Sequence, residues 1–212
     1  MKNNLLKKVA LFSVVSMLSC ATFGQETDQK IKLKQTDEKG QLSFISFKEN
    51  SNYTVDSFEK ILKAEFQLQD GIQFVKLHSE TDNLGFTHDK YQLYINGVKI
   101  EFATYTVHSK NGKIFAINGE TYKTNNVSTS PEVSAQDAFQ KAIKHLNAKQ
   151  YLWDNPSEAE KLDNYKKPSG ELVLLPIFND QSIELSTESN LKLAYKFDIY
   201  ATQPVSRGDV YV

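Results

Sequence analysis

The stretch THDKYQLYINGVKIEFATYTVH, residues 87–108, concentrates polar and aromatic side chains that could do chemistry. It holds His88 and His108, and two imidazoles could serve as metal ligands or as acid–base groups. At its centre is Asn96-Gly97, flanked by alternating apolar residues, which predicts a β-hairpin with a two-residue turn. Whether the two histidines meet depends on the register of that hairpin.

The register follows from the turn. With a two-residue loop, Ile95 opposes Val98, and the remaining pairs follow by alternation along both strands. His88 then opposes Tyr105, and His108 lies three residues farther along, about 10 Å away at about 3.3 Å per residue. An odd offset also places the two rings on opposite faces. Zinc binds imidazole nitrogens at about 2.0–2.1 Å, so this register excludes a zinc site made by these two histidines alone.

The same register divides the hairpin into an apolar face and a polar face. The apolar side chains, which we expect to pack on the core, are Tyr91, Leu93, Ile95, Val98, Ile100 and Phe102. The polar face, which we expect to be wet, carries His88, Lys90, Gln92, Tyr94, Lys99, Glu101 and Tyr105. A protein partner therefore suits this polar face better than a metal or a substrate.

The other histidines do not complete a catalytic group. His78 ends a predicted strand, and His145 lies late in a predicted helix, where a cation complements the helix dipole. The sequence contains no H-E-x-x-H, no G-x-S-x-G, no phosphate-binding loop and no Gly-rich dinucleotide motif. The adhesion-type tripeptide Arg207-Gly208-Asp209 leads directly into a predicted strand, so we set it aside. We therefore expect no catalysis, and no metal or cofactor, from the residues present.

The composition is that of an ordinary globular chain. Of 212 residues, 40% are hydrophobic and 24% are charged, and the formal net charge is -1. This balance gives no electrostatic reason to expect nucleic acid or an anionic membrane surface as a partner. The length suits one large domain or two small ones.

The first 24 residues are typical of a secretory signal peptide. Basic residues precede the apolar run Val9–Leu18, which is shorter than the roughly 20 residues that a transmembrane segment needs. We expect cleavage after Gly24 and a secreted, extracellular protein. The single cysteine, Cys20, lies in this segment, and lipoprotein anchoring at Cys20 is a minor alternative. A chain cleaved after Gly24 has no thiol for a disulfide or a nucleophile.

The rest of the chain alternates between strand and helix patterns. After a leader at 25–40, flexible or one ragged strand, QLSFISFK predicts a strand and helical spacing predicts a helix over 55–68. Residues 72–122 predict an antiparallel meander, because Asn111-Gly112 repeats the hairpin signal of Asn96-Gly97.

A polar linker, 124–131, marks the expected domain boundary. Beyond it, a capping box at Ser134 opens a helix, and Asn155-Pro156 opens a short helical turn. Three strands follow: ELVLLPIF, in which Pro176 favours a sheet edge, LKLAYKFDIYAT, and DVYV. The sequence therefore predicts an α+β fold of two small domains, 41–123 and 132–212, each an antiparallel sheet packed on a helix.

This order of elements, with HDKYQLYINGVKIEFATYTVHSKNGKIFAINGETY and LAYKFDIYATQPVSRGDVYV, resembles the pro-region of secreted thermolysin-like zinc metallopeptidases. Residues 41–123 look like the fungalysin/thermolysin propeptide domain. Residues 132–212 look like the cystatin-like PepSY domain, truncated in its last strand. The resemblance covers nearly all of the chain after the signal peptide.

The family's hairpin motif falls on His88, Lys90, Tyr91 and Gln92. Two positions depart from it, because Lys90 stands where Arg is usual and Lys99 stands where Pro is usual. Lysine lacks the planar fork of arginine, which puts a bidentate contact with a carboxylate in doubt.

The resemblance implies an intramolecular chaperone that also inhibits a peptidase catalytic domain, in cis or in trans. Zinc, and calcium, would belong to that catalytic domain, which is absent here. The candidate contact residues are His88, Lys90, Gln92, Lys99, Glu101 and Arg207. A free-standing secreted protease inhibitor, or a surface binding module, is the alternative. The last strand stops without a turn, so we expect the front part of a longer precursor with an open sheet edge.

Overall fold

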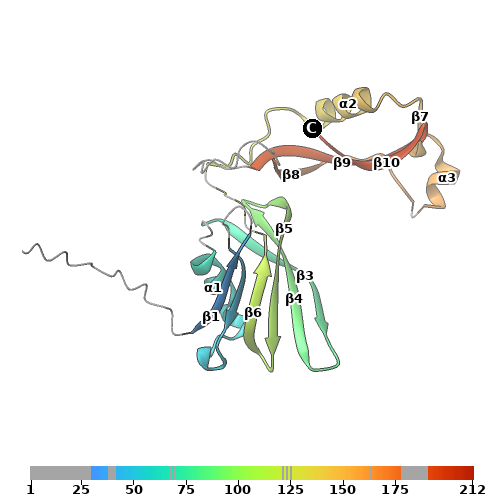
Figure 1. The fold of residues 1–212 in the computed structure, drawn as a ribbon. Helices are drawn as coiled ribbons and strands as arrows, with labels where there is room; N and C mark the ends of the chain where they lie inside the picture. Colours follow the sequence, from blue (N-terminus) through green and yellow to red (C-terminus); the bar gives the residue numbers. More distant parts are fainter. Residues whose placement is uncertain are drawn as a thin grey trace, which may run out of the picture.

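The computed structural model describes residues 30–37, 42–66, 68, 70–120, 122, 124, 126–162, 164–177 and 191–212. The predicted signal peptide and Cys20 lie outside these residues. Within them the fold is mixed α+β and mostly sheet (Figure 1). The strands are β1 (Ile31–Thr36), β2 (Leu42–Phe47), β3 (Ile72–Thr81), β4 (Phe86–Ile95), β5 (Val98–Lys110), β6 (Lys113–Gly119), β7 (Gln150–Tyr151), β8 (Glu171–Pro176), β9 (Leu191–Gln203) and β10 (Val205–Tyr211). The helices are α1 (Phe58–Glu65), α2 (Ala135–Leu146) and α3 (Pro156–Glu160), with short 3-10 turns at Glu49–Ser51, Val55–Ser57 and Leu152–Asp154.

The predicted meander is confirmed as strands β3 to β6, each antiparallel to the next. Both central residues of the first turn have positive φ, 49° at Asn96 and 80° at Gly97. The second turn repeats this geometry, with 51° at Asn111 and 74° at Gly112. These are the angles that a two-residue hairpin turn needs, and Asn and Gly adopt them at low cost.

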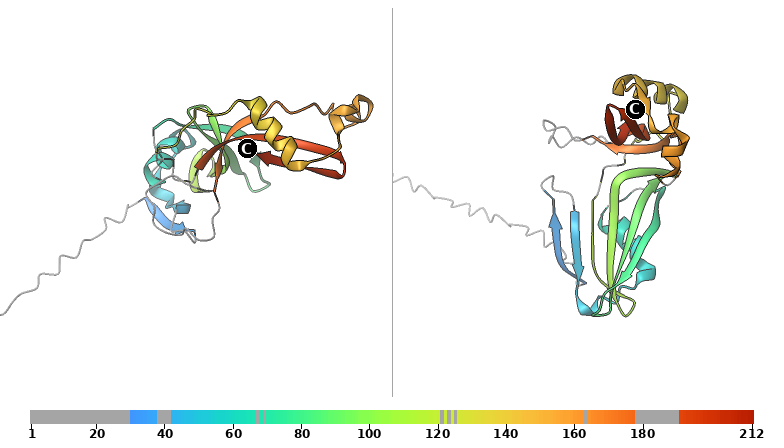
Figure 2. Two further views of the ribbon diagram at one scale, coloured as in Figure 1. Left: turned by 90° about the horizontal axis from the view of Figure 1, so that it is seen from above. Right: turned by 90° about the vertical axis from the view of Figure 1, so that its right-hand side faces the viewer.

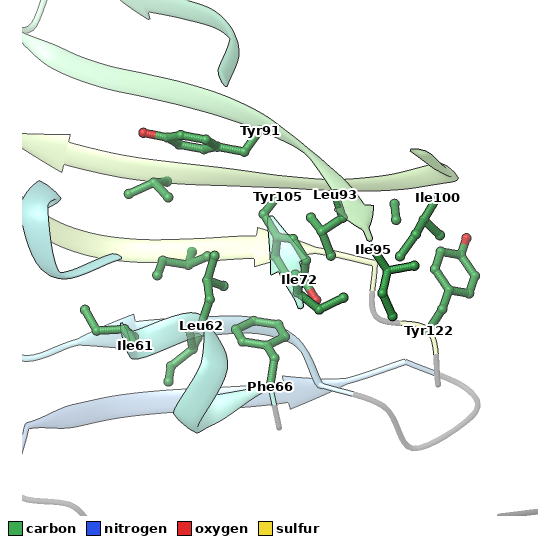
Figure 3. Close-up of a cluster of buried hydrophobic side chains, with 14 of the residues drawn as sticks. Ile61, Leu62, Phe66, Ile72, Tyr91, Leu93, Ile95, Ile100, Tyr105 and Tyr122 are labelled. Carbon is green, nitrogen blue, oxygen red and sulfur yellow. The ribbon is translucent and has the colours of Figure 1, made fainter. Parts of the chain in front are cut away.

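Strands β1 and β2 extend the meander beyond β6. Part of the predicted leader is therefore strand β1, which pairs with β2 because Ile31 packs against the core. The predicted helix is confirmed as a 3-10 turn followed by α1, which buries Ile61 and Leu62. In Figure 3, Leu62 and Phe66 point toward Ile72 and Tyr105 of the strands, so α1 closes one face of the meander.

The C-terminal strands β8, β9 and β10 are antiparallel neighbours in that order. Helix α2 lies on the side of β9 that faces away from the meander (Figures 1 and 2). Phe139 of α2 packs there on Phe197 and Ile199 in a second apolar cluster. The predicted cap of α2 is confirmed, because the Ser134 hydroxyl accepts the Asp137 N–H at 3.1 Å.

The two groups of strands join in one sheet, because β8 pairs in parallel with β5 at Lys99↔Val173 and Ile100↔Leu174. The prediction that Pro176 marks an edge strand is wrong, since β8 lies between β5 and β9. Pro176 ends β8, beyond the short pairing with β5, where its missing N–H is tolerated. Leu174 also belongs to the core under α1, and the independence of two domains stays a prediction.

Candidate functional site

The β4–β5 hairpin departs from its predicted register a short distance from the turn. The pairs Ile95↔Val98 and Tyr94↔Lys99 are as predicted, but Gln92 then pairs with Thr104. The residues between them on β5 form a bulge, in which Phe102 has a φ of 65°. The predicted register is wrong beyond this point, because the bulge adds three residues to β5 and an odd shift exchanges its two faces.

This exchange of faces corrects two burial predictions. Phe102, expected in the core, is 51% exposed, and Tyr105, expected to be wet, is completely buried. The face opposite α1 now carries residues such as Lys90, Thr106 and His108. We call this the outer face: the sheet surface of β3–β6 that α1 does not cover. Lys90 is exposed on it, and His88 keeps about a third of its side chain accessible.

Gln92 explains how the bulge is held. Its Nε2 amide donates to the carbonyl of Ile100 at 2.6 Å, to that of Ala103 at 2.9 Å and to that of Leu93 at 3.2 Å. Two of these carbonyls belong to the bulge, where the regular ladder cannot satisfy them. Gln92 is 5% exposed, so the expectation that it lies on a wet surface is wrong. Gln92 lies inside the mostly apolar run YQLYI, and this position in the sequence could have indicated that its side chain is buried and hydrogen-bonded.

Glu101 is also buried rather than wet. It is 4% exposed, and its Oε1 atom accepts from Lys99 at 3.2 Å and from Lys196 of β9 at 3.1 Å. Lys196 also pairs with Asp209 of β10 at 3.0 Å. Burial alone would lower the pKa of Lys196, but the carboxylates of Asp209 and Glu101 outweigh it and raise that pKa above its usual range. These charges join the meander to the C-terminal strands, a long-range contact that spacing in the sequence could not reveal.

The bulge brings the two histidines together. His88 opposes His108 in the ladder, and their Nδ1 atoms lie 2.6 Å apart. The predicted three-residue offset, and with it the placement on opposite faces, is wrong for the same reason as the register. His108 Nε2 lies 2.5 Å from the Asn118 side-chain oxygen, and His88 Nε2 lies 3.8 Å from Asp82.

The neighbours of the pair determine which nitrogen carries each proton. His108 donates Nε2–H to Asn118, which leaves its Nδ1 free to accept a hydrogen bond from His88. The N–H groups of Phe86 and Leu84 bind the Asp82 carboxylate and hold its pKa below the usual range. Asp82 therefore stays negative at 3.8 Å from the Nε2 atom of His88.

The pair fits a shared proton better than a metal ion. Two nitrogens bound to one zinc at about 2.0–2.1 Å in tetrahedral geometry lie about 3.4 Å apart, farther than the 2.6 Å between the Nδ1 atoms. In the described part of the chain, no group of three or more His, Cys, Asp or Glu side chains is placed to hold a metal ion. The arrangement here is a hydrogen bond between two imidazole rings.

Arg207 lies on β10 and forms its own cluster. Its guanidinium donates to both carboxylate oxygens of Asp198, at 2.8 and 3.2 Å, and lies over the rings of Tyr165 and Tyr200. This hydrogen bonding lowers the pKa of Asp198 and raises that of Arg207. Of the predicted contact residues, the structure joins Lys99 to Glu101 through an ion pair and leaves Lys90 and His88 on the outer face.

Comparison with known protein families identifies a matching segment that coincides with the meander. Residues 72–121 match the family model described as Fungalysin/Thermolysin Propeptide Motif. The comparison with curated proteins gave no match. None of the helices among the described residues is long and apolar enough to cross a membrane. The matched residues run from the start of β3 to just beyond β6, so the strands that carry the outer face form a thermolysin/fungalysin-type propeptide motif.

Proposed function

We propose that the chain is the pro-region of a secreted thermolysin-like zinc metallopeptidase, and that it assists the folding of the catalytic domain and inhibits it. The observation that carries this proposal is the match of β3–β6 to the propeptide motif. Zinc, and calcium, are assigned to the catalytic domain and not to this chain. The PepSY identity of 132–212 and the signal peptide are parts of the same proposal.

The outer face is the surface that we assign to the catalytic domain. It is a wide sheet surface with one face already fixed by α1, so it needs little ordering when it binds. Lys90 and His88 lie on this face beside the exposed His78 and Glu80 of β3. Gln92 holds the backbone of the bulge, and Glu101 joins β5 to β9 through Lys196. A preformed surface that binds the native catalytic domain better than its unfolded chain stabilises that domain by mass action.

The test is inhibition and refolding in trans. The purified chain is mixed with the catalytic domain of a thermolysin-like peptidase, and peptide hydrolysis is followed with increasing amounts of the chain. In a second assay, the denatured catalytic domain is diluted from urea with and without the chain. We expect saturable inhibition and a higher yield of active enzyme. If a large molar excess of the chain gives neither inhibition nor a higher yield of active enzyme, the proposal is ruled out.

A charge reversal tests the surface itself. Lys90→Glu changes an exposed residue on the outer face, and Lys60→Glu changes an exposed residue on α1. Both substitutions alter the net charge equally, so only the position differs. We expect the Lys90 variant to inhibit at least about tenfold less strongly, a loss of about 1.4 kcal/mol in binding. Equal inhibition by the two variants would place the contact elsewhere.

A further inference from the structure

Strand β3 forms one margin of the meander (Figure 1). It pairs with β4 on one side, and none of the described strands pairs with its other side. All seven residues from Val75 to Thr81 are exposed, so neither face of this half of the strand is covered. Within the described part of the chain, this half of β3 therefore presents an open edge to a further strand.

The backbone groups of β3 show which residues an added strand would meet. The Asp82 N–H donates to the carbonyl of Phe86 in β4 at 2.9 Å. The backbone groups of an antiparallel strand alternate between its two sides. Those of Glu80 therefore also point toward β4, whereas those of Ser79 and Thr81 point toward the open edge. Each of these last two residues offers one donor and one acceptor to an incoming backbone.

The edge also carries exposed apolar side chains. Val75 is 44% exposed and Leu77 is 54% exposed, and Leu84, in the turn to β4, is 72% exposed. Soluble proteins usually protect an edge strand with proline, lysine or a bulge. Strand β3 has a bulge next to Lys76, but the stretch His78–Thr81 beyond it contains neither lysine nor proline. This stretch is therefore able to pair with another strand.

The polar residues of the edge match a second copy of the same edge. When two β3 strands run antiparallel with Ser79 opposite Ser79, each His78 lies opposite the Glu80 of the other copy. These two residue types already meet within one chain, where the imidazole Nε2 lies 3.5 Å from the carboxylate. Leu77 then lies opposite Thr81, and no residues of like charge meet. A shift that set Glu80 opposite Glu80 would bring two carboxylates together and use backbone groups that already point toward β4.

We propose that the β3 edge binds the β3 edge of a second copy of this chain, antiparallel and about a two-fold axis at Ser79. Both copies use the same surface, so the assembly closes as a dimer. The pairing continues the sheet in its own plane, which leaves Lys90 and His88 of the outer face accessible. At each end of the ladder, the turn with Leu84 lies beside Val75 of the other copy. The dimer does not depend on the proposed function.

The first test is the mass of the chain in solution. Sedimentation equilibrium of the 212-residue chain is measured from about 10 μM to about 1 mM, because so short a ladder predicts a weak dimer. We expect the weight-average mass to rise with concentration toward twice the mass of the single chain. A mass that stays at the single-chain value up to about 1 mM would overturn the proposal.

Hydrogen exchange locates the contact along the chain. We expect the amides of Ser79 and Thr81 to exchange more slowly as the concentration rises, in proportion to the fraction of single chains, because the dimer supplies their acceptors. The amide of Glu80 already points toward β4, so its exchange should not change in this way. Equal slowing at Ser79 and Glu80 would exclude pairing at this edge.

An exchange of charges tests the register of the dimer. Glu80→Lys removes the carboxylate opposite His78 in both copies, so we expect it to weaken the dimer about tenfold. The double variant His78→Glu/Glu80→Lys sets opposite charges across the axis again and should dimerise within about threefold of the wild-type chain. Both variants carry the same lysine, so only the residue opposite it differs. Equal weakening in the single and double variants would overturn the proposed register.

A matched pair of leucine variants tests the choice of edge. Leu77→Lys places a charge on the β3 edge, and we expect it to weaken the dimer about tenfold. Leu33→Lys makes the same change on β1, at the opposite end of the strand order, where Leu33 is 46% exposed. This control should dimerise like the wild-type chain. Equal dimerisation of the two variants would overturn the assignment to β3.

Discussion

The Nδ1 atoms of His88 and His108 face one another at 2.6 Å across β4 and β5. A hydrogen bond between them needs one ring with a proton on Nδ1 and one without. The ring centroids lie 4.9 Å apart. The contact therefore joins β4 to β5 at the end of the hairpin near Asp82.

The first prediction is that the contact between the two rings holds this end of the hairpin. His108→Leu removes the ring that faces His88 and leaves the Nδ1 atom of His88 without its partner. We expect amide exchange to accelerate in β4 and β5 near Asp82, by a free energy on the order of 1 kcal/mol, because a net hydrogen bond contributes about that much.

A second variant separates this effect from the general loss of a histidine. His78→Leu changes a histidine that contacts Glu80 on the exposed side of β3, and it should leave amide exchange in β4 and β5 unchanged. Equal acceleration in both variants would mean that the ring pair is not its source.

The second prediction concerns the amide that holds the bulge. Gln92→Ala leaves the carbonyls of Ile100 and Ala103 buried without their donor, so we expect a loss of about 2–3 kcal/mol in the free energy of unfolding. Gln73→Ala changes an exposed glutamine on the neighbouring strand and should cost less than about 0.5 kcal/mol. Urea denaturation of both variants measures the difference. A similar small cost at both positions would contradict the role of Gln92 in holding the bulge.

Local signals in the sequence predicted much of this fold. The turns at Asn96-Gly97 and Asn111-Gly112, the apolar face of α1 and the cap at Ser134 depend on residues close in sequence, and the structure confirms them. The bulge was not predictable in this way, because it depends on one side chain that reaches across to the neighbouring strand. The errors in the register, in the burial of Phe102 and Tyr105, and in the placement of the two histidines follow from that bulge.

Long-range pairings were missed for a different reason. The parallel contact between β5 and β8 joins Ile100 to Leu174, and no periodicity in either segment specifies the other. The ion pairs of Glu101 with Lys196 follow from that contact, since they form where the two groups of strands meet. Some of the residues that we expected to be exposed contacts because they are charged therefore form ion pairs at this junction instead.

The third prediction tests the junction. Lys196→Met keeps the length of the side chain and removes its charge, which leaves buried Glu101 with Lys99 as its remaining cation. We expect a loss of about 2 kcal/mol in stability, because hydrogen bonds to charged groups contribute about 1.5–3 kcal/mol. Lys192→Met, on an exposed position of the same strand, is the control and should have little effect. Chemical denaturation at neutral pH provides the comparison.

The pH dependence of Lys196 gives an independent check on the same contact. Its pKa is raised in the folded chain, so its contribution is fully present below about pH 10.4, the ordinary lysine value, and is lost as the pH rises through the folded value. The wild-type chain should therefore lose stability above about pH 10.4 more steeply than the Lys196→Met variant. Parallel alkaline curves for the two proteins would count against the ion pairs.

The fourth prediction concerns Asp198, whose hydrogen bonds from Arg207 lower its pKa in the folded chain. A lowered pKa means that the pair contributes above about pH 3.9, the ordinary aspartate value, and that this contribution is lost as the pH falls through the lower folded value. The pair is partly exposed, so Asp198→Asn should cost less than about 1 kcal/mol at neutral pH. The variant and the wild-type chain should then converge in stability in strong acid.

The control for this prediction is Asp70→Asn, which changes an exposed aspartate before β3 and should follow the wild-type curve throughout. A constant difference between Asp198→Asn and wild type at every pH would show that the loss comes from packing around Tyr165 and Tyr200, not from the charge.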